Sequence, residues 1–166
     1  MTDEAFEQIV RSHANTIFRV ACHAVKDRQE AEDVTQTVFL KLYERKESFE
    51  SEEHGKAWLI RVAVNESRRL LSAPWKKRTI PLEDWDGPDE KNEESGVLHE
   101  VMVLEPKYRL SIYLYYYEGY SVREVAQIMR TRESTVQTWL QRGREKLRGA
   151  LAEEGGNTCV RPEFLS

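Results

Sequence analysis

The stretch Glu118–Arg148 constrains the fold of this chain more than any other part of its sequence. Gly119 can end an incoming helix, because helices commonly end on a left-handed residue and glycine adopts that conformation at little cost. Ser121 and Glu124 then have the Ser-x-x-Glu spacing of a capping box, which indicates the start of a new helix. Apolar residues follow at helical spacing and predict one buried stripe, formed by Val122, Val125, Ala126 and Met129.

A second, longer helix is predicted from about Glu133 past Leu147, after a break near Arg130–Arg132. Its inner side is apolar or small, with Val136, Leu140, Gly143, Leu147 and Leu151. Its outer side carries hydroxyl, amide and guanidinium groups, at Ser134, Gln137, Thr138, Gln141, Arg142, Arg144 and Arg148. A short helix, a tight turn and a longer helix with such a polar face are typical of a helix-turn-helix.

The chemistry of this outer face suits DNA. Arg and Gln side chains can make bidentate hydrogen bonds to purine edges in the major groove, while Ser, Thr and further Arg side chains hold phosphates. Residues 130–148 include six basic side chains and two acidic ones, a net charge of +4, whereas the whole chain carries −4. The alternative is a solvated face on a structural helix pair, and this stretch alone leaves both interpretations open.

Two amphipathic helices are predicted at the beginning of the chain. The first covers residues 4–25, and we expect its histidines, His13 and His23, to be packed core residues, because nothing nearby offers metal-ligand spacing. Asp27 begins the second helix, with Glu30 at the capping-box position.

The outer side of this second helix places two polar residues, Asp33 and Gln36, beside Leu40. An exposed leucine among polar groups is either an isolated feature or the apolar centre of a protein-binding patch. Phe39 fits the core and the patch equally well by periodicity. The pattern therefore indicates a candidate protein-binding face here.

A third helix is predicted from about Lys56, after a polar, irregular segment that contains one aromatic residue, Phe49. Its apolar side consists of Trp58, Leu59, Val62, Ala63 and Leu70. A basic, hydrogen-bonding face consists of Arg61, Asn65, Arg68 and Arg69. A cationic helix beside an aromatic-bearing loop is what unstacked bases require. The alternative is a core helix with a solvated edge.

From Ser72 to Gly96 the helical pattern fails, and Pro and acidic residues predict a flexible linker between two lobes. A short helix is expected over Val97–Leu104, and Pro106 suits the first turn of the next helix. After Glu153 the chain has no periodicity.

Composition narrows the class of protein. A chain of 166 residues with 40% hydrophobic and 33% charged residues, and apolar periods near that of a helix, predicts an all-α fold in one or two small domains. No run is long enough to cross a membrane, and the N-terminus lacks the pattern of a signal peptide. Cys22 and Cys159 lie far apart, so we expect a reduced, cytoplasmic location and no metal or cofactor. No catalytic arrangement is evident, which argues against an enzyme.

The order of these parts resembles the extracytoplasmic-function (ECF) sigma factors, the small two-domain branch of the sigma-70 family that programs bacterial RNA polymerase. EAEDVTQTVFLKLY (30–43) looks like the polymerase-binding helix of that family, and AWLIRVAVN (57–65) is similar to its helix that faces the minus-ten promoter element. LEPKYRLSIYLYYYEGYSVREVA and STVQTWLQRGREKLR resemble its second domain, which reads the minus-thirty-five element. The resemblance covers residues 5–152.

This resemblance implies an all-α fold of two small helical domains joined by a flexible acidic linker. Sigma region 2 would cover residues 1–72, the linker 73–96 and the region 4 helix-turn-helix 97–153, followed by a tail at 154–166. The protein would bind core RNA polymerase and promoter DNA and direct transcription initiation. An anti-sigma factor is the expected regulator.

The resemblance also implies roles for individual residues. The clamp helices of the largest polymerase subunit would be contacted by Asp33, Gln36, Phe39 and Leu40. The minus-ten element would be contacted by Phe49, Arg61, Asn65, Arg68 and Arg69. The minus-thirty-five element would be contacted by Arg132, Ser134, Thr135, Gln137, Thr138, Gln141, Arg142 and Arg144.

Three positions depart from the family pattern. The turn of the second domain usually reads Leu-Gly-Ile-Ser, whereas this chain has Met-Arg-Thr-Arg at 129–132. Arg130 thus replaces the turn glycine, at a left-handed position where a non-glycine residue costs about 1 kcal/mol. Trp139 stands where a basic residue is common, and either packs inward or contacts the DNA backbone. Glu66–Arg69 replaces the usual apolar run and Asp of the family, so the resemblance does not define where this helix ends.

Two further functions compete with the sigma hypothesis. One is an autonomous helix-turn-helix regulator that binds duplex DNA as a dimer. The basic face in the N-terminal lobe and the long linker argue against it. The other is a protein-interaction module that keeps the fold but sequesters a partner, and the presence of both basic faces argues against that.

Overall fold

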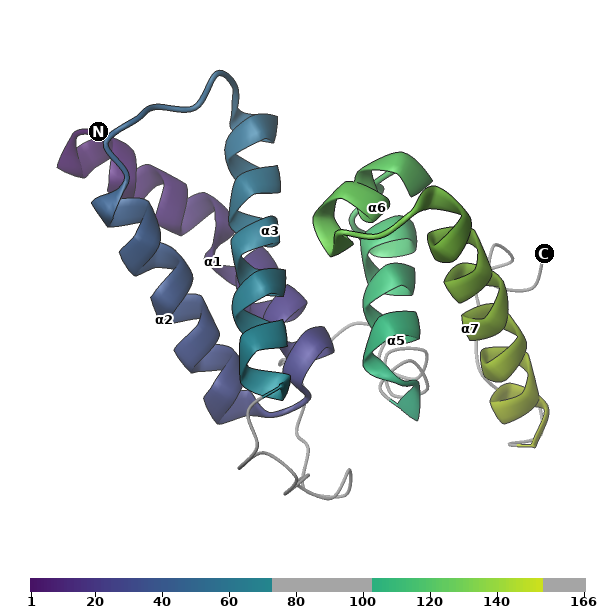
Figure 1. The fold of residues 1–166 in the computed structure, drawn as a ribbon. Coiled ribbons are helices and arrows are strands. Elements are labelled where there is room, and N and C mark those ends of the chain that lie inside the picture. The colour runs from purple at the N-terminus through teal and green to yellow at the C-terminus, as the bar shows by residue number, and fades with distance from the viewer. Residues whose placement is uncertain (73–102, 154–166) are drawn as a thin grey trace. The chain divides into compact units, whose positions relative to one another are not determined.

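The computed structural model describes residues 1–72 and 103–153, with side chains up to residue 149. Every regular element in these ranges is a helix, which confirms the all-α prediction (Figure 1). The chain divides into two compact units, Met1–Trp85 and Asp86–Ser166. The predicted linker, the tail and most of the predicted helix Val97–Leu104 lie outside the described residues, so the domain boundaries remain a prediction.

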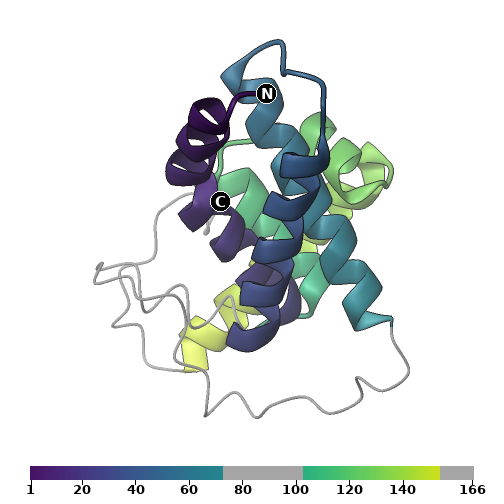
Figure 2. The same ribbon diagram turned by 90° about the vertical axis from the view of Figure 1, so that its left-hand side faces the viewer.

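The first unit consists of three helices: α1 (Asp3–Val25), α2 (Arg28–Glu44) and α3 (Glu52–Leu71). Each of the three packs against the other two (Figure 2). The cap of α2 confirms the prediction for Asp27, whose carboxylate accepts a hydrogen bond from Glu30 N at 3.0 Å. The predicted start of α3 near Lys56 is wrong. This helix begins at Glu52, because the Ser51 hydroxyl caps it by accepting from His54 N at 3.1 Å.

Aliphatic side chains from all three helices fill the core of the first unit. The residues with 0 or 1% exposure include Ile17, Val20, Ala31, Val34, Val38, Leu42, Leu59, Ile60, Ala63 and Val64. His13 and His23 are buried among them, which confirms their prediction as core residues. Burial also raises the pKa of the Cys22 thiol to about 12. The predicted apolar side of α3 is partly wrong, because Trp58, Val62 and Leu70 are only half-buried.

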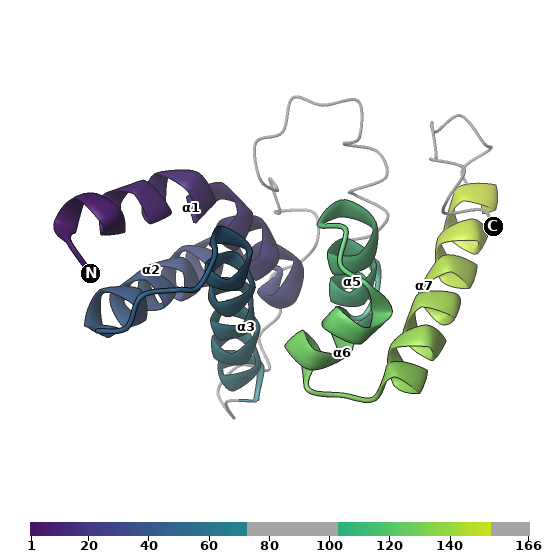
Figure 3. The same ribbon diagram turned by 90° about the horizontal axis from the view of Figure 1, so that it is seen from above.

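The second unit consists of α5 (Pro106–Ile112), the π-helical turn η3 (Tyr113–Tyr117), α6 (Val122–Met129) and α7 (Glu133–Glu153). Helix α7 packs against both α5 and α6 (Figure 3). Pro106 occupies the first turn of α5, as predicted. The sequence pattern did not predict the π-helical turn.

Local signals set the ends of the helices in this unit. Gly119 has φ +76°, which confirms the left-handed conformation expected after η3. The Ser121 hydroxyl accepts a hydrogen bond from Glu124 N at 3.2 Å and donates to the Glu124 carboxylate at 3.0 Å. The serine cap predicted for α6 is therefore present, and the Glu124 carboxylate is bonded to the hydroxyl of Ser121.

Helix α7 approaches α5 closely through Gly143. A Cβ at this position would lie 2.5 Å from Ile112 Cδ1 and 3.5 Å from Tyr108 Cβ. Val136, Leu140 and Leu147 are buried on the same side of α7, as predicted, whereas the side chain of Leu151 lies outside the described residues. Packing against α5 therefore fixes which side of α7 faces solvent.

No helix within residues 1–72 or 103–153 is both long and apolar enough to span a bilayer. The same part of the chain contains no group of His, Cys, Asp and Glu side chains arranged to hold a metal ion.

Candidate nucleic-acid and protein interfaces

The outer side of α2 combines polar and apolar exposure. Asp33 and Gln36 are exposed, Phe39 is half-buried and Leu40 keeps 58% of its surface exposed. The structure thus places the four predicted residues on one side of α2, with Phe39 at the edge of the core. A leucine with this much exposed surface, between polar side chains, is suited to contact with another protein.

A groove between α1 and α2 extends this apolar surface. It has a volume of about 500 Å³ and is lined by Phe6, Val10, Ala14, Thr35, Gln36, Phe39, Leu40 and Tyr43. Tyr43 is 65% exposed, and its ring meets Phe6 edge to face at a centroid distance of 5.4 Å. Sequence reasoning missed the α1 side of this groove, because Phe6 and Val10 share the helical spacing of the α1 core residues.

The side chain of Phe49 packs against the start of α3. Its ring centroid lies 5.6 Å from that of Trp58 and 5.7 Å from that of His54. The Arg45 guanidinium lies 4.6 Å from the centre of the Phe49 ring and 5.1 Å from that of Trp58. The loop before α3 is thus held by an aromatic cluster, defined as Arg45, Phe49, His54 and Trp58.

Gly55 allows this packing. A Cβ on Gly55 would lie 3.0 Å from Phe49 Cδ2, closer than carbon atoms normally approach. The ring therefore rests almost directly on the backbone of α3.

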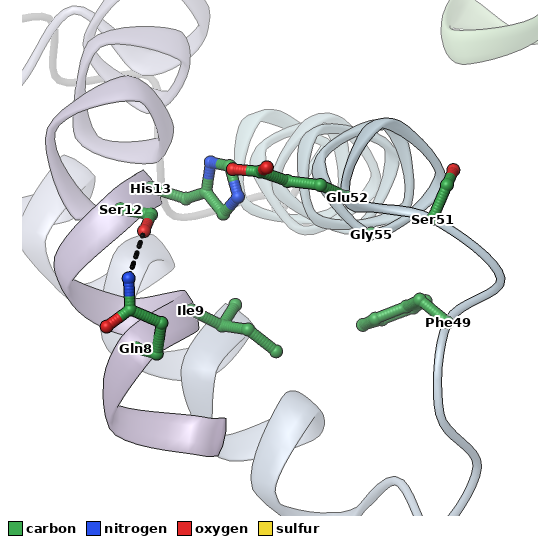
Figure 4. Close-up of a pocket in the computed structure, with 8 residues that line it drawn as sticks. All are labelled: Gln8, Ile9, Ser12, His13, Phe49, Ser51, Glu52 and Gly55. Atoms are coloured by element: carbon green, nitrogen blue, oxygen red, sulfur yellow. Dashed lines mark hydrogen bonds between the residues drawn. The ribbon is translucent and has the colours of Figure 1, made fainter. Parts of the chain in front are cut away.

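A pocket of about 300 Å³ lies on the α1 side of Phe49 (Figure 4). The Phe49 ring points toward Ile9 across it, and His13 and Glu52 line one wall. Burial lowers the pKa of His13, and the nearby Glu52 carboxylate partly opposes that shift. On α1, Gln8 donates a hydrogen bond to the Ser12 hydroxyl at 3.5 Å.

The predicted basic face of α3 is present at helical spacing. Arg61, Arg68 and Arg69 are exposed and Asn65 is half-buried. Glu66 lies next to this face but is only 6% exposed. Its carboxylate contacts Lys41 Nζ on α2, and its second oxygen lies 2.9 Å from Arg69 Nη2. Helix α3 continues past these residues to Leu71, so the departure from the family pattern does not shorten it.

In the second unit, Arg130 forms the turn of the helix-turn-helix with φ +52° and ψ +51°. This is the left-handed conformation expected at the position of the family glycine. Thr131 N donates to Ala126 O at 3.0 Å across the turn. Arg132 supplies only its carbonyl to the first turn of α7, accepting from Thr135 N and Val136 N at 3.1 Å.

The outer face of α7 is largely as predicted. The exposed residues among the candidates are Arg132, Ser134, Gln137, Thr138, Gln141 and Arg142. Thr135 and Trp139 are half-buried. Gln141 donates to the Glu145 carboxylate at 3.4 Å, and the Thr138 hydroxyl donates to Ser134 O at 3.0 Å.

Arg144 differs from the other candidates on α7. It is half-buried, and its Nη1 donates to the Tyr116 hydroxyl on η3 at 3.0 Å. Both residues line a polar depression of about 730 Å³ together with Tyr115, Gly119, Tyr120, Ser121 and Glu124. Arg144 therefore joins α7 to η3 and is set apart from the exposed row. The contact spans 28 positions, so helical periodicity could not reveal it.

Comparison with known proteins identifies two family segments. The model for sigma-70 region 2 matches residues 9–77, and the model for sigma-70, region 4 matches residues 97–147. The chain is 30% identical over 153 residues to the RNA polymerase sigma-E factor of Streptomyces coelicolor, a match that covers 88% of this chain and 85% of that protein.

Two further similarities span most of the chain. It is 25% identical over 167 residues to the ECF RNA polymerase sigma factor SigE of Mycolicibacterium smegmatis, covering 93% of this chain but 65% of that protein. Its fold is similar to that of the sigma factor RpoE from Bartonella quintana, solved in complex with the anti-sigma factor NepR. That likeness has a TM-score of 0.64 and 21% identity, and covers 90% of this chain and 98% of that chain.

Proposed function

Because this chain belongs to the ECF group of the sigma-70 family of RNA polymerase sigma factors, we propose that it binds core RNA polymerase and directs transcription to specific promoters. The observation that carries this proposal is the presence of an exposed basic, hydrogen-bonding helix face in each unit, on α3 and on α7. One protein then contacts two separate promoter elements. Family membership favours this function over that of an autonomous dimeric regulator.

The apolar groove between α1 and α2 is the proposed polymerase contact. Leu40 and Phe39 would bury apolar surface against the clamp helices of the largest subunit, and Asp33 and Gln36 would hydrogen-bond at the rim. A central apolar contact within a polar rim is the usual anatomy of a protein interface. The exposure of Leu40, at 58%, supports its place at the centre.

The proposed minus-ten contact combines the loop that carries Phe49 with the face of α3 formed by Arg61, Asn65, Arg68 and Arg69. Arginine side chains would hold phosphates of the non-template strand, while an aromatic ring offers a stacking surface to an unpaired base. Unstacking a base costs a few kcal/mol. We therefore expect the isolated protein to leave duplex DNA closed, and polymerase contacts to supply the remaining free energy.

The proposed minus-thirty-five contact is the exposed row of α7 in the major groove. Gln137, Gln141 and Arg142 have the donors and acceptors that read base edges, and Ser134 and Thr138 suit phosphates. Arg132 and Thr135, at the start of α7, would contact the DNA backbone. Arg144 donates to the Tyr116 hydroxyl, so it would contact DNA through its other N–H groups.

Regulation and location follow from the same proposal. The similar fold of Bartonella quintana RpoE was solved with an anti-sigma factor, and we propose that this chain is also controlled by one. It would act in the cytoplasm, where RNA polymerase works. Its role would be that of a specificity subunit without catalytic residues of its own.

The test is multi-round transcription by purified bacterial core polymerase on a pooled promoter library, with and without this protein. Discrete start sites that depend on the protein would support the proposal, and their upstream sequences would give both promoter elements. Replacing Asp33 and Gln36 with alanine should abolish these transcripts. The matched control is Arg11→Ala with Asn15→Ala, two exposed positions on α1 outside the groove.

Two results would contradict parts of this proposal. Normal transcription by the Asp33 and Gln36 double variant would refute the assigned polymerase contact. An absence of transcripts, together with tight binding of duplex DNA by the protein alone, would favour the autonomous regulator.

A further inference from the structure

Glu66 is a buried carboxylate beside an otherwise exposed basic face. Its side chain is 8% exposed, whereas Arg69, one helical turn later on α3, is 74% exposed. Buried glutamates are rare unless a cation compensates them, because removing a charge from water costs free energy. The surroundings of Glu66 therefore determine what it can do.

Each oxygen of the Glu66 carboxylate has its own cation. Oε1 contacts Lys41 Nζ, which reaches across from α2, and Oε2 lies 2.9 Å from Arg69 Nη2. Burial alone would raise the pKa of Glu66, but hydrogen bonds and charge interactions with Lys41 and Arg69 outweigh it and lower that pKa. Glu66 is thus ionised at neutral pH, and Lys41 fixes the direction in which its second oxygen points.

This arrangement is not explained by stability alone. An apolar side chain would fill a buried site on α3 at least as well, since buried ion pairs often contribute no more than well-packed hydrophobic residues. What the carboxylate adds is a fixed acceptor position for the Arg69 guanidinium. An arginine that is 74% exposed is otherwise free to sample many rotamers, and a short ion pair to a fixed oxygen restricts them.

We infer that Glu66 is a positioning residue, which is anchored by Lys41 and orients Arg69 toward a phosphate of promoter DNA. Arg69 shares its face of α3 with Arg61 and Asn65. A guanidinium has five N–H donors, so those not engaged by Glu66 remain available to a phosphate. This inference rests on the proposed minus-ten contact.

A positioning role for Glu66 and simple electrostatics predict opposite changes in promoter affinity when Glu66 loses its charge. Glu66→Gln removes one negative charge next to DNA, and by charge alone this tightens binding. If Glu66 positions Arg69, the same substitution weakens binding, because a neutral amide offers one acceptor oxygen in place of two and holds the guanidinium less firmly. The sign of the change therefore decides between the two.

The experiment measures the affinity of the reconstituted holoenzyme for a promoter fragment at several salt concentrations. For Glu66→Gln we expect an affinity about 3- to 10-fold lower. The slope of log affinity against log salt concentration should also be smaller, by up to about the value for one phosphate contact. Arg69→Gln should have the same effect, and the double variant should be no worse than either single variant. Lys41→Met should shift affinity in the same direction, because it releases the anchor.

Equal or tighter promoter binding by Glu66→Gln would overturn the inference, as would losses that add in the double variant. The circular dichroism spectrum of each variant and its affinity for core RNA polymerase should match those of the unchanged protein. These two controls distinguish the loss of a DNA contact from the loss of the fold. If Arg61→Ala and Asn65→Ala weaken binding but Arg69→Gln does not, the minus-ten contact stands and the role of Glu66 fails. If none of these variants changes binding, the minus-ten contact on α3 fails as well.

Discussion

The close contact between Gly143 and α5 allows a sharp test of packing in the second unit. In Gly143→Ala, the new Cβ would lie 2.5 Å from Ile112 Cδ1, and Ile112 is fully buried. Overpacking of this kind typically costs about 1–3 kcal/mol. Alanine is also the better helix former by about 1 kcal/mol, which offsets part of that cost.

Gly149 supplies the matched control. It lies on the same helix, and a Cβ there would meet no heavy atom within 4 Å. Gly149→Ala should therefore show the helix-propensity gain alone, up to about 1 kcal/mol. The difference between the two variants isolates the overpacking, so Gly143→Ala should be less stable than Gly149→Ala by about 1–3 kcal/mol.

A second substitution identifies the atom responsible. Ile112→Val removes Cδ1, the atom nearest the new Cβ, and should cost about 0.5–1.5 kcal/mol in the unchanged protein. In the Gly143→Ala background this cost should shrink or reverse, because the shortened side chain makes room for the methyl group. Such non-additivity is expected only for residues in contact.

Native-state hydrogen exchange of α5 and α7 amides in the full chain is the suitable assay, because it reports the opening free energy of this unit separately from the first. Gly143→Ala as stable as Gly149→Ala, or additive effects of Gly143→Ala and Ile112→Val, would refute the packing argument.

Three further predictions concern a turn, a carboxylate and a thiol. Arg130→Gly should stabilise the second unit by up to about 1 kcal/mol, because Arg130 has φ +52°; Arg130→Ala removes the same charge without relieving the backbone, and an equal gain in both would point to charge instead. Glu66 has a folded-state pKa below its ordinary 4.5, so its stabilising contribution is present above pH 4.5 and is lost as the pH falls through the lower, folded value. The free energy of unfolding, measured with urea, should therefore differ less between the unchanged protein and Glu66→Gln as the pH falls through that range. A difference that grows as the pH falls would contradict this prediction. Cys22 should resist alkylation at pH 8 in the folded chain and react on unfolding, because burial raises its pKa to about 12; rapid native labelling of Cys22, located by peptide mapping, would show that the site opens readily.

Local signals in the sequence were enough to locate most helix ends. Asp27, Gly119 and Ser121 act through neighbours within a few positions, so their caps and turns could be read from spacing alone. Ser51 offered the same kind of signal, reinforced by the two glutamates after it, but interpreting the polar segment up to Gly55 as irregular placed the start of α3 too late. The stripe that faces α5 was also predictable, because the helical period fixes which residues of α7 share a side.

Contacts between distant residues could not be predicted in this way. Helical spacing from Leu59 and Ala63 puts position 66 on the inner side of α3, but a glutamate is expected there only if a cation compensates it. The compensating cation, Lys41, comes from another helix 25 positions earlier, which spacing alone does not reveal. The groove on α2 likewise depends on Phe6 from α1, whose register against α2 is set only by the packing of the whole unit. Helical spacing gave most of the candidate residues, the family resemblance assigned a partner to each face, and the structure adds which of the residues are exposed.

The aromatic cluster around Phe49 bears on how tightly an unpaired promoter strand is bound. A base that stacks on the face of Phe49 next to the Arg45 guanidinium must displace that guanidinium, which lies 4.6 Å from the ring centre. The loop would then need an open form that accepts the base, beside the self-stacked form seen here. Apparent affinity for the unpaired strand equals the intrinsic affinity multiplied by the open fraction, so substitutions that loosen the cluster would tighten the capture of melted DNA.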